Sequence, residues 1–205
     1  MQGQEVRNCV YEGQFNKLLK ELNTAPAWRE IMGIAGEDKR MRDVELVLRF
    51  FALFYNAENY KKPMKGFLNQ FMADHRRAPE IHEGDSEAKR KAIEEKRRAY
   101  EETLKEFADL FNRTSEAVIK YLGAKPFHVQ RGFNAAVFDS VFTAFAHHLD
   151  KVSNGKASAA KVNQVNTNFK TLLANKQYIK WTSAATADTD VVPKRLKKAE
   201  KILFG

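Results

Sequence analysis

Residues 38–56 read DKRMRDVELVLRFFALFYN, the most apolar stretch of this chain. Apolar side chains recur at helical spacing along one stripe, and further apolar residues widen that stripe almost all the way round. A helix that is apolar on nearly every side belongs at the centre of a helical bundle. Within it, the longest apolar run, residues 44–55, is too short to span a bilayer and contains the charged residues Glu45 and Arg49. It therefore predicts a buried central helix.

The segments on both sides of this stretch also follow a helical period, and we find no run of alternating β-branched residues. The pattern predicts an all-α, irregular multi-helix bundle of one domain with little or no sheet. Helices are expected near residues 4–11, 14–22, 26–33, 63–75, 87–123, 133–151, 158–175, 177–181 and 191–203. Ser86 can cap the longest of them, which we expect to kink or break at residues 112–115. Residues 1–155 would form the core of the bundle, and residues 156–205 a basic helical part packed on the same domain.

Composition excludes several classes of protein. The single cysteine, Cys9, excludes an internal disulfide framework and a multi-cysteine zinc site. The sequence has no glycine-rich phosphate loop, no GxSxG elbow and no HExxH pair. We therefore expect no catalytic residues, no metal and no cofactor in this chain alone. The N-terminus lacks a secretory signal, which favours the cytoplasm, and no segment suits a membrane partner.

Positive charge is concentrated near the C-terminus. Residues 156–205 hold ten basic and three acidic residues, which places +7 of the net +9 in this quarter of the chain. The last expected helix carries four lysines at spacings of three and four residues, so they share one face. With the adjacent arginine, they form the candidate nucleic-acid-binding set Lys194, Arg195, Lys197, Lys198 and Lys201. An equally weighted alternative is a basic helix end that interacts with its own dipole.

Two further polar groups lie within apolar segments. Arg49 needs a carboxylate if it is buried, and Glu45, four residues earlier, is the local candidate. An internal ion pair is favoured over a ligand contact. Asp139, His147 and His148 form the set for an alternative reading, a metal-dependent nuclease. Neighbouring histidines on a helix point about 100° apart, so surface or helix-end histidines are favoured.

Several short segments, in this order, resemble the GmrSD-type family of bacterial restriction and phage-defence proteins. They are QEVRNCVYEGQFNKLL at 4–19, KRMRDVELVLRFFA at 39–52, Tyr60 with MKGFLN at 64–69, FNAAVFD at 133–139, and the segment from Thr182 to Arg195. The family combines a ParB-like α/β domain, which carries a DGQQR-type motif, with a helical part and often an HNH nuclease domain. This chain contains neither motif and matches the helical part alone.

The resemblance implies a non-catalytic helical module that docks a ParB-like domain in cis or in trans and contacts DNA. The polar residues that match the family segments are Arg7, Asn8, Arg49, Asn134 and Asp139, and the resemblance assigns them no individual role. A pure interaction or scaffold module remains the alternative, in which Cys9, Val10, Tyr11 and Phe15 would form an exposed apolar patch.

Overall fold

The computed structural model describes residues 3–129, 132–153 and 158–205. Helix makes up 73% of the chain, and the all-α class is confirmed. The side chains of Asn8 and Cys9 are not among the described ones, so the expectations for these two fall outside the description.

The first part of the chain forms helices beside one another. They are α1 (Gly3–Val10), α2 (Gln14–Asn23), α3 (Pro26–Met32), α4 (Arg42–Asn56), the 3-10 turn η1 (Ala57–Asn59) and α5 (Met64–Asp74). The apolar stretch that opened the sequence forms α4, whose described neighbours include α2, α5 and α7. Its first four residues do not join the helix, because Met41 adopts a left-handed conformation with φ 54°. The predicted central helix is therefore present and starts at Arg42.

The rest of the chain is also helical apart from one short hairpin. Its elements are α6 (Glu87–Leu122), β1 (His128–Val129), β2 (Gly132–Phe133), α7 (Ala135–His147), α8 (Leu149–Ser153), α9 (Ala159–Ala174), α10 (Lys176–Ser183) and α11 (Val191–Phe204). The hairpin is antiparallel and pairs His128 with Phe133 and Val129 with Gly132. One helix was expected over residues 133–151, but Phe133 lies in β2 and the helix ends at His147.

Helix α6 is continuous for 36 residues. Ser86 caps it, as predicted, by accepting a hydrogen bond from the Lys89 amide. The predicted break at residues 112–115 is wrong. The hydroxyl of Thr114 donates to the Leu110 carbonyl at 2.6 Å, and that of Ser115 donates to the Phe111 carbonyl at 2.9 Å. These bonds satisfy both hydroxyls inside the helix, so neither has to end it.

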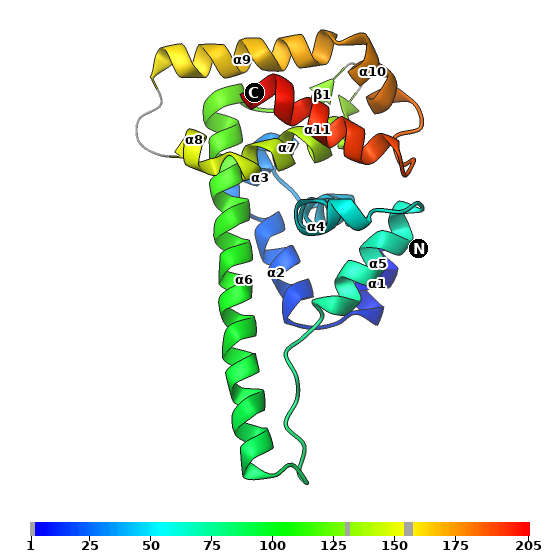
Figure 1. The fold of residues 1–205 in the computed structure, drawn as a ribbon, viewed down its shortest axis with the longest axis vertical. Coiled ribbons are helices and arrows are strands. Elements are labelled where there is room, and N and C mark those ends of the chain that lie inside the picture. The colour runs from blue at the N-terminus through cyan, green and yellow to red at the C-terminus, as the bar shows by residue number, and fades with distance from the viewer. Residues whose placement is uncertain (1–2, 130–131, 154–157) are drawn as a thin grey trace.

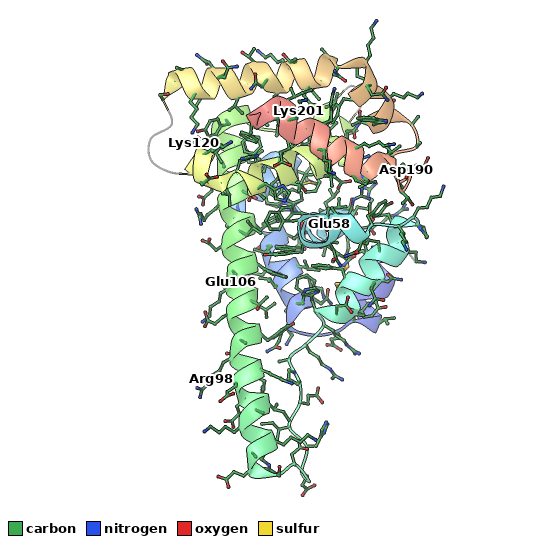
Figure 2. The ribbon with its side chains drawn as sticks, in the orientation of Figure 1. Glu58, Arg98, Glu106, Lys120, Asp190 and Lys201 are labelled. Carbon is green, nitrogen blue, oxygen red and sulfur yellow. The ribbon has the colours of Figure 1, made fainter. Side chains whose placement is uncertain are left out.

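The N-terminal half of α6 extends well past the other helices (Figure 1). Figure 2 shows Arg98 and Glu106 directed away from the bundle. In this half of α6, Ala92 and Ala99 are exposed, whereas Ile93 is buried.

One hydrophobic core unites both parts of the chain. Aromatic rings link α3, α4 and α6: Phe51 of α4 stacks on Phe107 of α6 with centroids 4.9 Å apart, and Trp28 of α3 meets Phe111 of α6 at 5.5 Å. The same buried cluster runs on to Leu203 in α11, which packs on α7 and α9. The basic C-terminal part therefore shares the core of residues 1–155. None of the helices in the described ranges is both long and apolar enough to cross a bilayer.

Candidate functional site

The most connected polar group in the interior is the carboxylate of Asp139 on α7. Arg49 of α4 binds it with two atoms, Nε to Oδ1 at 3.1 Å and Nη2 to Oδ2 at 2.5 Å. The Asp139 side chain is completely buried and that of Arg49 is 16% exposed. The expected partner of Arg49 was Glu45, and this was wrong, although the favoured reading of an internal ion pair is correct.

A second arginine reaches the same carboxylate. Arg195 of α11 places Nη2 3.3 Å from Asp139 Oδ2, and both side chains have zero exposure. Its Nη1 donates to the carbonyls of Trp181 at 3.2 Å and Thr186 at 2.8 Å. Arg195 was expected on the nucleic-acid-binding surface, and its burial corrects that expectation. The sequence spacing could have predicted this burial, because Arg195 lies three residues after Val192 and four before Ala199, and both of these residues are buried.

The two arginines respond differently to this environment. Burial opposes the charge of Arg49, but the attraction of Asp139 and Glu45 outweighs it, so the pKa of Arg49 is raised. Burial dominates at Arg195 and lowers its pKa, although the attraction of Asp139 opposes this shift. Nearby, the Tyr178 hydroxyl lies 2.6 Å from Ser140 Oγ, and burial raises the pKa of Tyr178. Each of these groups is held by protein partners, which suits an anchoring role rather than acid–base chemistry.

Glu45 has a different arginine as its partner. It forms an ion pair with Arg7 of α1, whose Nε donates to Gln4 Oε1 at 2.8 Å. Burial lowers the pKa of Arg7 despite the attraction of Glu45. Asn134 caps α7 by accepting from the amides of Ala136 and Val137 at 3.0 and 3.1 Å. Arg7, Arg49, Asn134 and Asp139 therefore all hold helices in place.

A second buried acid, Asp43, was not singled out from the sequence. Its Oδ2 accepts from Arg29 Nη1 at 2.9 Å, from Asn23 Nδ2 at 3.0 Å and from the Asp38 amide at 2.9 Å. Asn23 in turn accepts from the indole of Trp28 at 3.0 Å. Its position in the first turn of an apolar helix, where a carboxylate is favoured, could have predicted a structural role for Asp43.

Asp43, Glu45 and Arg49 border a cleft of about 460 Å³ between the start of α4 and the β-hairpin. Its walls include Ile34, Arg42, Glu45, Arg49 and His128. Its arginines are already paired: Arg42 binds Asp38 at 2.6 Å, and Arg49 binds Asp139. The cleft thus offers an opening beside the ion pairs, but its cations are committed to the protein's own acids.

The three residues of the alternative nuclease site do not meet. Asp139 is enclosed by two arginines, whereas His147 and His148 both face Glu200 of α11, at 3.7 and 3.1 Å. Eight residues of helix separate Asp139 from His147, about 12 Å along the axis. Within the described ranges, no group of three or more His, Cys, Asp and Glu side chains is arranged to hold a metal ion.

The four lysines of the candidate nucleic-acid set lie on the outer side of α11. Lys194, Lys197 and Lys201 are exposed and Lys198 is half-buried. Lys197 and Lys201 line a hollow of about 380 Å³ together with Lys151 of α8, which the sequence did not single out. We call Lys194, Lys197, Lys198 and Lys201 the lysine face.

Comparisons of the chain with protein-family models, with curated protein sequences and with solved structures find no match. The class that the geometry defines is an all-α domain whose interior is organised by buried arginine–carboxylate groups. Its function has to be inferred from its own residues.

Proposed function

We propose that this chain is a cytoplasmic, non-catalytic helical module of the GmrSD type, which docks a ParB-like domain and contacts DNA through the lysine face. The observation that carries the proposal is that the two sides of α11 differ in their surroundings. One side of the helix is anchored in the core through Arg195, and the opposite side carries the lysine face, of which three lysines are exposed and Lys198 is half-buried.

The geometry of α11 favours a polyanion. Lysines at positions i, i+3, i+4 and i+7 lie within about 100° of one another around a helix, so they can follow one line of phosphates. Lys151 adds a fifth cation from a different helix beside Lys197 and Lys201. Glu200 is the acid in that hollow, and His147 and His148 already contact it. The site is thus a cationic surface with its nearby acid engaged elsewhere.

Salt-dependent DNA binding tests this part of the proposal. Fluorescence anisotropy with a labelled duplex should show affinity that falls steeply as salt rises. The triple variant Lys194→Gln, Lys197→Gln, Lys201→Gln should lower the slope of log affinity against log salt by about 0.9 per lost phosphate contact. The matched control removes three exposed lysines of α6, at positions 91, 96 and 105, and should leave the slope unchanged.

Two results would contradict DNA contact at this face: no binding at low salt, or equal losses in the two triple variants. The first would leave the interaction-module alternative in place. Sedimentation of the chain alone then separates self-association from a monomer that needs another partner.

The docking part of the proposal rests on the N-terminal region. Val10 is 53% exposed, whereas Phe15, expected in the same patch, is completely buried. The patch is therefore smaller than expected. Co-purification with a ParB-like domain encoded beside the gene tests it, and Val10→Asp should weaken the complex. If Val10→Asp leaves the co-purification unchanged, the ParB-like domain does not dock at Val10.

A further inference from the structure

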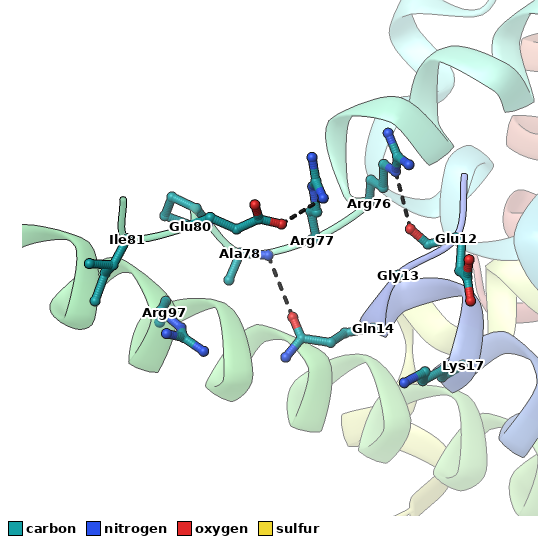
Figure 3. A pocket seen from close by; sticks show the side chains of 11 residues that line it. Glu12, Gly13, Gln14, Lys17, Arg76, Arg77, Ala78, Glu80, Ile81 and Arg97 are labelled. Carbon is teal, nitrogen blue, oxygen red and sulfur yellow. Dashed lines mark hydrogen bonds and ion pairs between the residues drawn. The ribbon is translucent and has the colours of Figure 1, made fainter. Parts of the chain in front are cut away.

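A cleft of about 650 Å³ lies far from the lysine face, where α2, the segment after α5 and α6 come together (Figure 3). Three separate segments contribute four cations to it: Lys17, Arg76, Arg77 and Arg97. Two acids, Glu12 and Glu80, also line it. Glu80 already forms an ion pair with Arg77 at 2.6 Å.

The other three cations of the cleft, Lys17, Arg76 and Arg97, form no ion pair with a carboxylate in the described part of the chain. Arg76 is held by a hydrogen bond from Nε to the Glu12 carbonyl at 3.1 Å, which leaves its two Nη groups without an acceptor among the described residues. The side chains of Lys17 and Arg97 have no ion pair or hydrogen bond within the described ranges. This differs from the cleft beside Arg49, where each arginine already has a carboxylate partner.

Arg97 lies at a position of α6 where the seven-residue repeat predicts an apolar side chain. The inward stripe of α6 repeats every seven residues through Ile93, Tyr100 and Phe107, and through Leu104 and Phe111. Arg97 lies seven residues before Leu104, on that same stripe. Its guanidinium is thus directed by the helix to the cleft, whereas neighbouring Arg98 points away from the bundle (Figure 2).

The backbone around the cleft is fixed by close contact. A Cβ on Gly13 would overlap the Arg76 carbonyl oxygen, so the glycine allows the segment after α5 to lie against the start of α2. The Ala78 amide lies 3.5 Å from Gln14 Oε1 and adds to this contact (Figure 3). Ala78, Pro79 and Ile81 of the same segment give the cleft a short apolar wall.

We propose that this cleft binds the phosphate groups of a small ligand, which Arg97, Arg76 and Lys17 would contact from different sides (Figure 3). Guanidinium groups match phosphate oxygens in a two-point geometry, and an ammonium adds a compact charge. The volume lies within the usual range of roughly 300–1,000 Å³ for small-molecule sites. The apolar wall would contact the uncharged part of the ligand.

Isothermal titration calorimetry with pyrophosphate at low ionic strength tests this site. The parent protein should bind, and Arg97→Gln should weaken binding by at least about tenfold, the loss expected for one charge-assisted contact. Arg98→Gln, one residue further along the same helix, is the matched control and should stay within about twofold. Circular dichroism should show the same helix content in both variants.

Titrations with a nucleoside diphosphate and with pyrophosphate show whether the cleft recognises the phosphate alone or also the rest of the ligand. A nucleoside diphosphate that binds more tightly than pyrophosphate would support a ligand that also uses the apolar wall, and equal affinities would support recognition of the phosphate alone. The α11 triple lysine variant should bind pyrophosphate like the parent, which keeps this test independent of DNA binding. No heat with pyrophosphate, or equal losses in Arg97→Gln and Arg98→Gln, would overturn the proposal.

Discussion

Arg49 and Asp139 are separated by 90 residues in the chain and form a two-point ion pair that joins α4 to α7. Arg195 adds a third helix, α11, to the same carboxylate. One acid thereby holds two buried cations, and the position of three helices depends on it.

Asp139→Asn should destabilise the protein strongly. The change removes the negative charge and leaves two guanidinium groups buried without compensation, a loss of about 3–5 kcal/mol. Denaturation by urea measures it. The matched control is Asp109→Asn, which breaks the pair with Arg113 on the exposed side of α6. That pair is solvated, and its loss should cost no more than about 1 kcal/mol. Similar losses in the two variants would show that Asp139 does not organise the interior.

Gly13→Ala should loosen the segment after α5. The added methyl group overlaps the Arg76 carbonyl, so that segment has to move away from α2. Arg76 and Arg77 are trypsin sites, and their cleavage should become several times faster. Gly84→Ala is the control, because a Cβ there meets nothing within 4 Å. Unchanged cleavage in Gly13→Ala would mean that the two segments are not in close contact.

Stability should fall in alkali, and Tyr178 should contribute to the fall. Burial raises the pKa of Tyr178 above its ordinary value of 10.0. Above pH 10 the unfolded chain therefore loses a proton that the folded protein keeps, and the stability present below pH 10 is lost as pH rises. Tyr178→Phe should reduce this slope by up to about 1.4 kcal/mol per pH unit. Urea denaturation between pH 9 and about 11.5 measures it, and parallel slopes for parent and variant would contradict the assignment.

The two halves of α6 should differ in local stability. Ile93 is the buried residue in the first half, whereas Phe107, Phe111, Val118 and Tyr121 are buried in the second. Amides of residues 90–99 should therefore exchange with deuterium faster than those of residues 111–121, since local opening exposes little apolar surface there. Hydrogen exchange with mass spectrometry measures the difference, and uniform protection along α6 would count against it.

The sequence was sufficient for the elements whose periodicity is unambiguous. The apolar pattern of residues 44–55 predicts α4, and Ser86 predicts the start of α6. The partners of Arg49 could not be predicted, because proximity in the chain favoured Glu45 and only the folded arrangement brings Asp139 near. The break expected at residues 112–115 failed for a related reason. Whether Thr114 and Ser115 end a helix depends on which acceptor each hydroxyl finds, and composition does not specify that acceptor.

The shared carboxylate of Asp139 also has a consequence for synthesis on the ribosome. Its first partner, Arg49, has been made long before Asp139 emerges, but the second is made 56 residues later. Until Arg195 leaves the exit tunnel, α7 lacks the helix that covers it, and the nascent chain exposes the apolar surface that Leu196, Ala199 and Leu203 later bury. The final folding step is therefore expected to follow translation of α11, and a chaperone that recognises apolar segments would act in that interval.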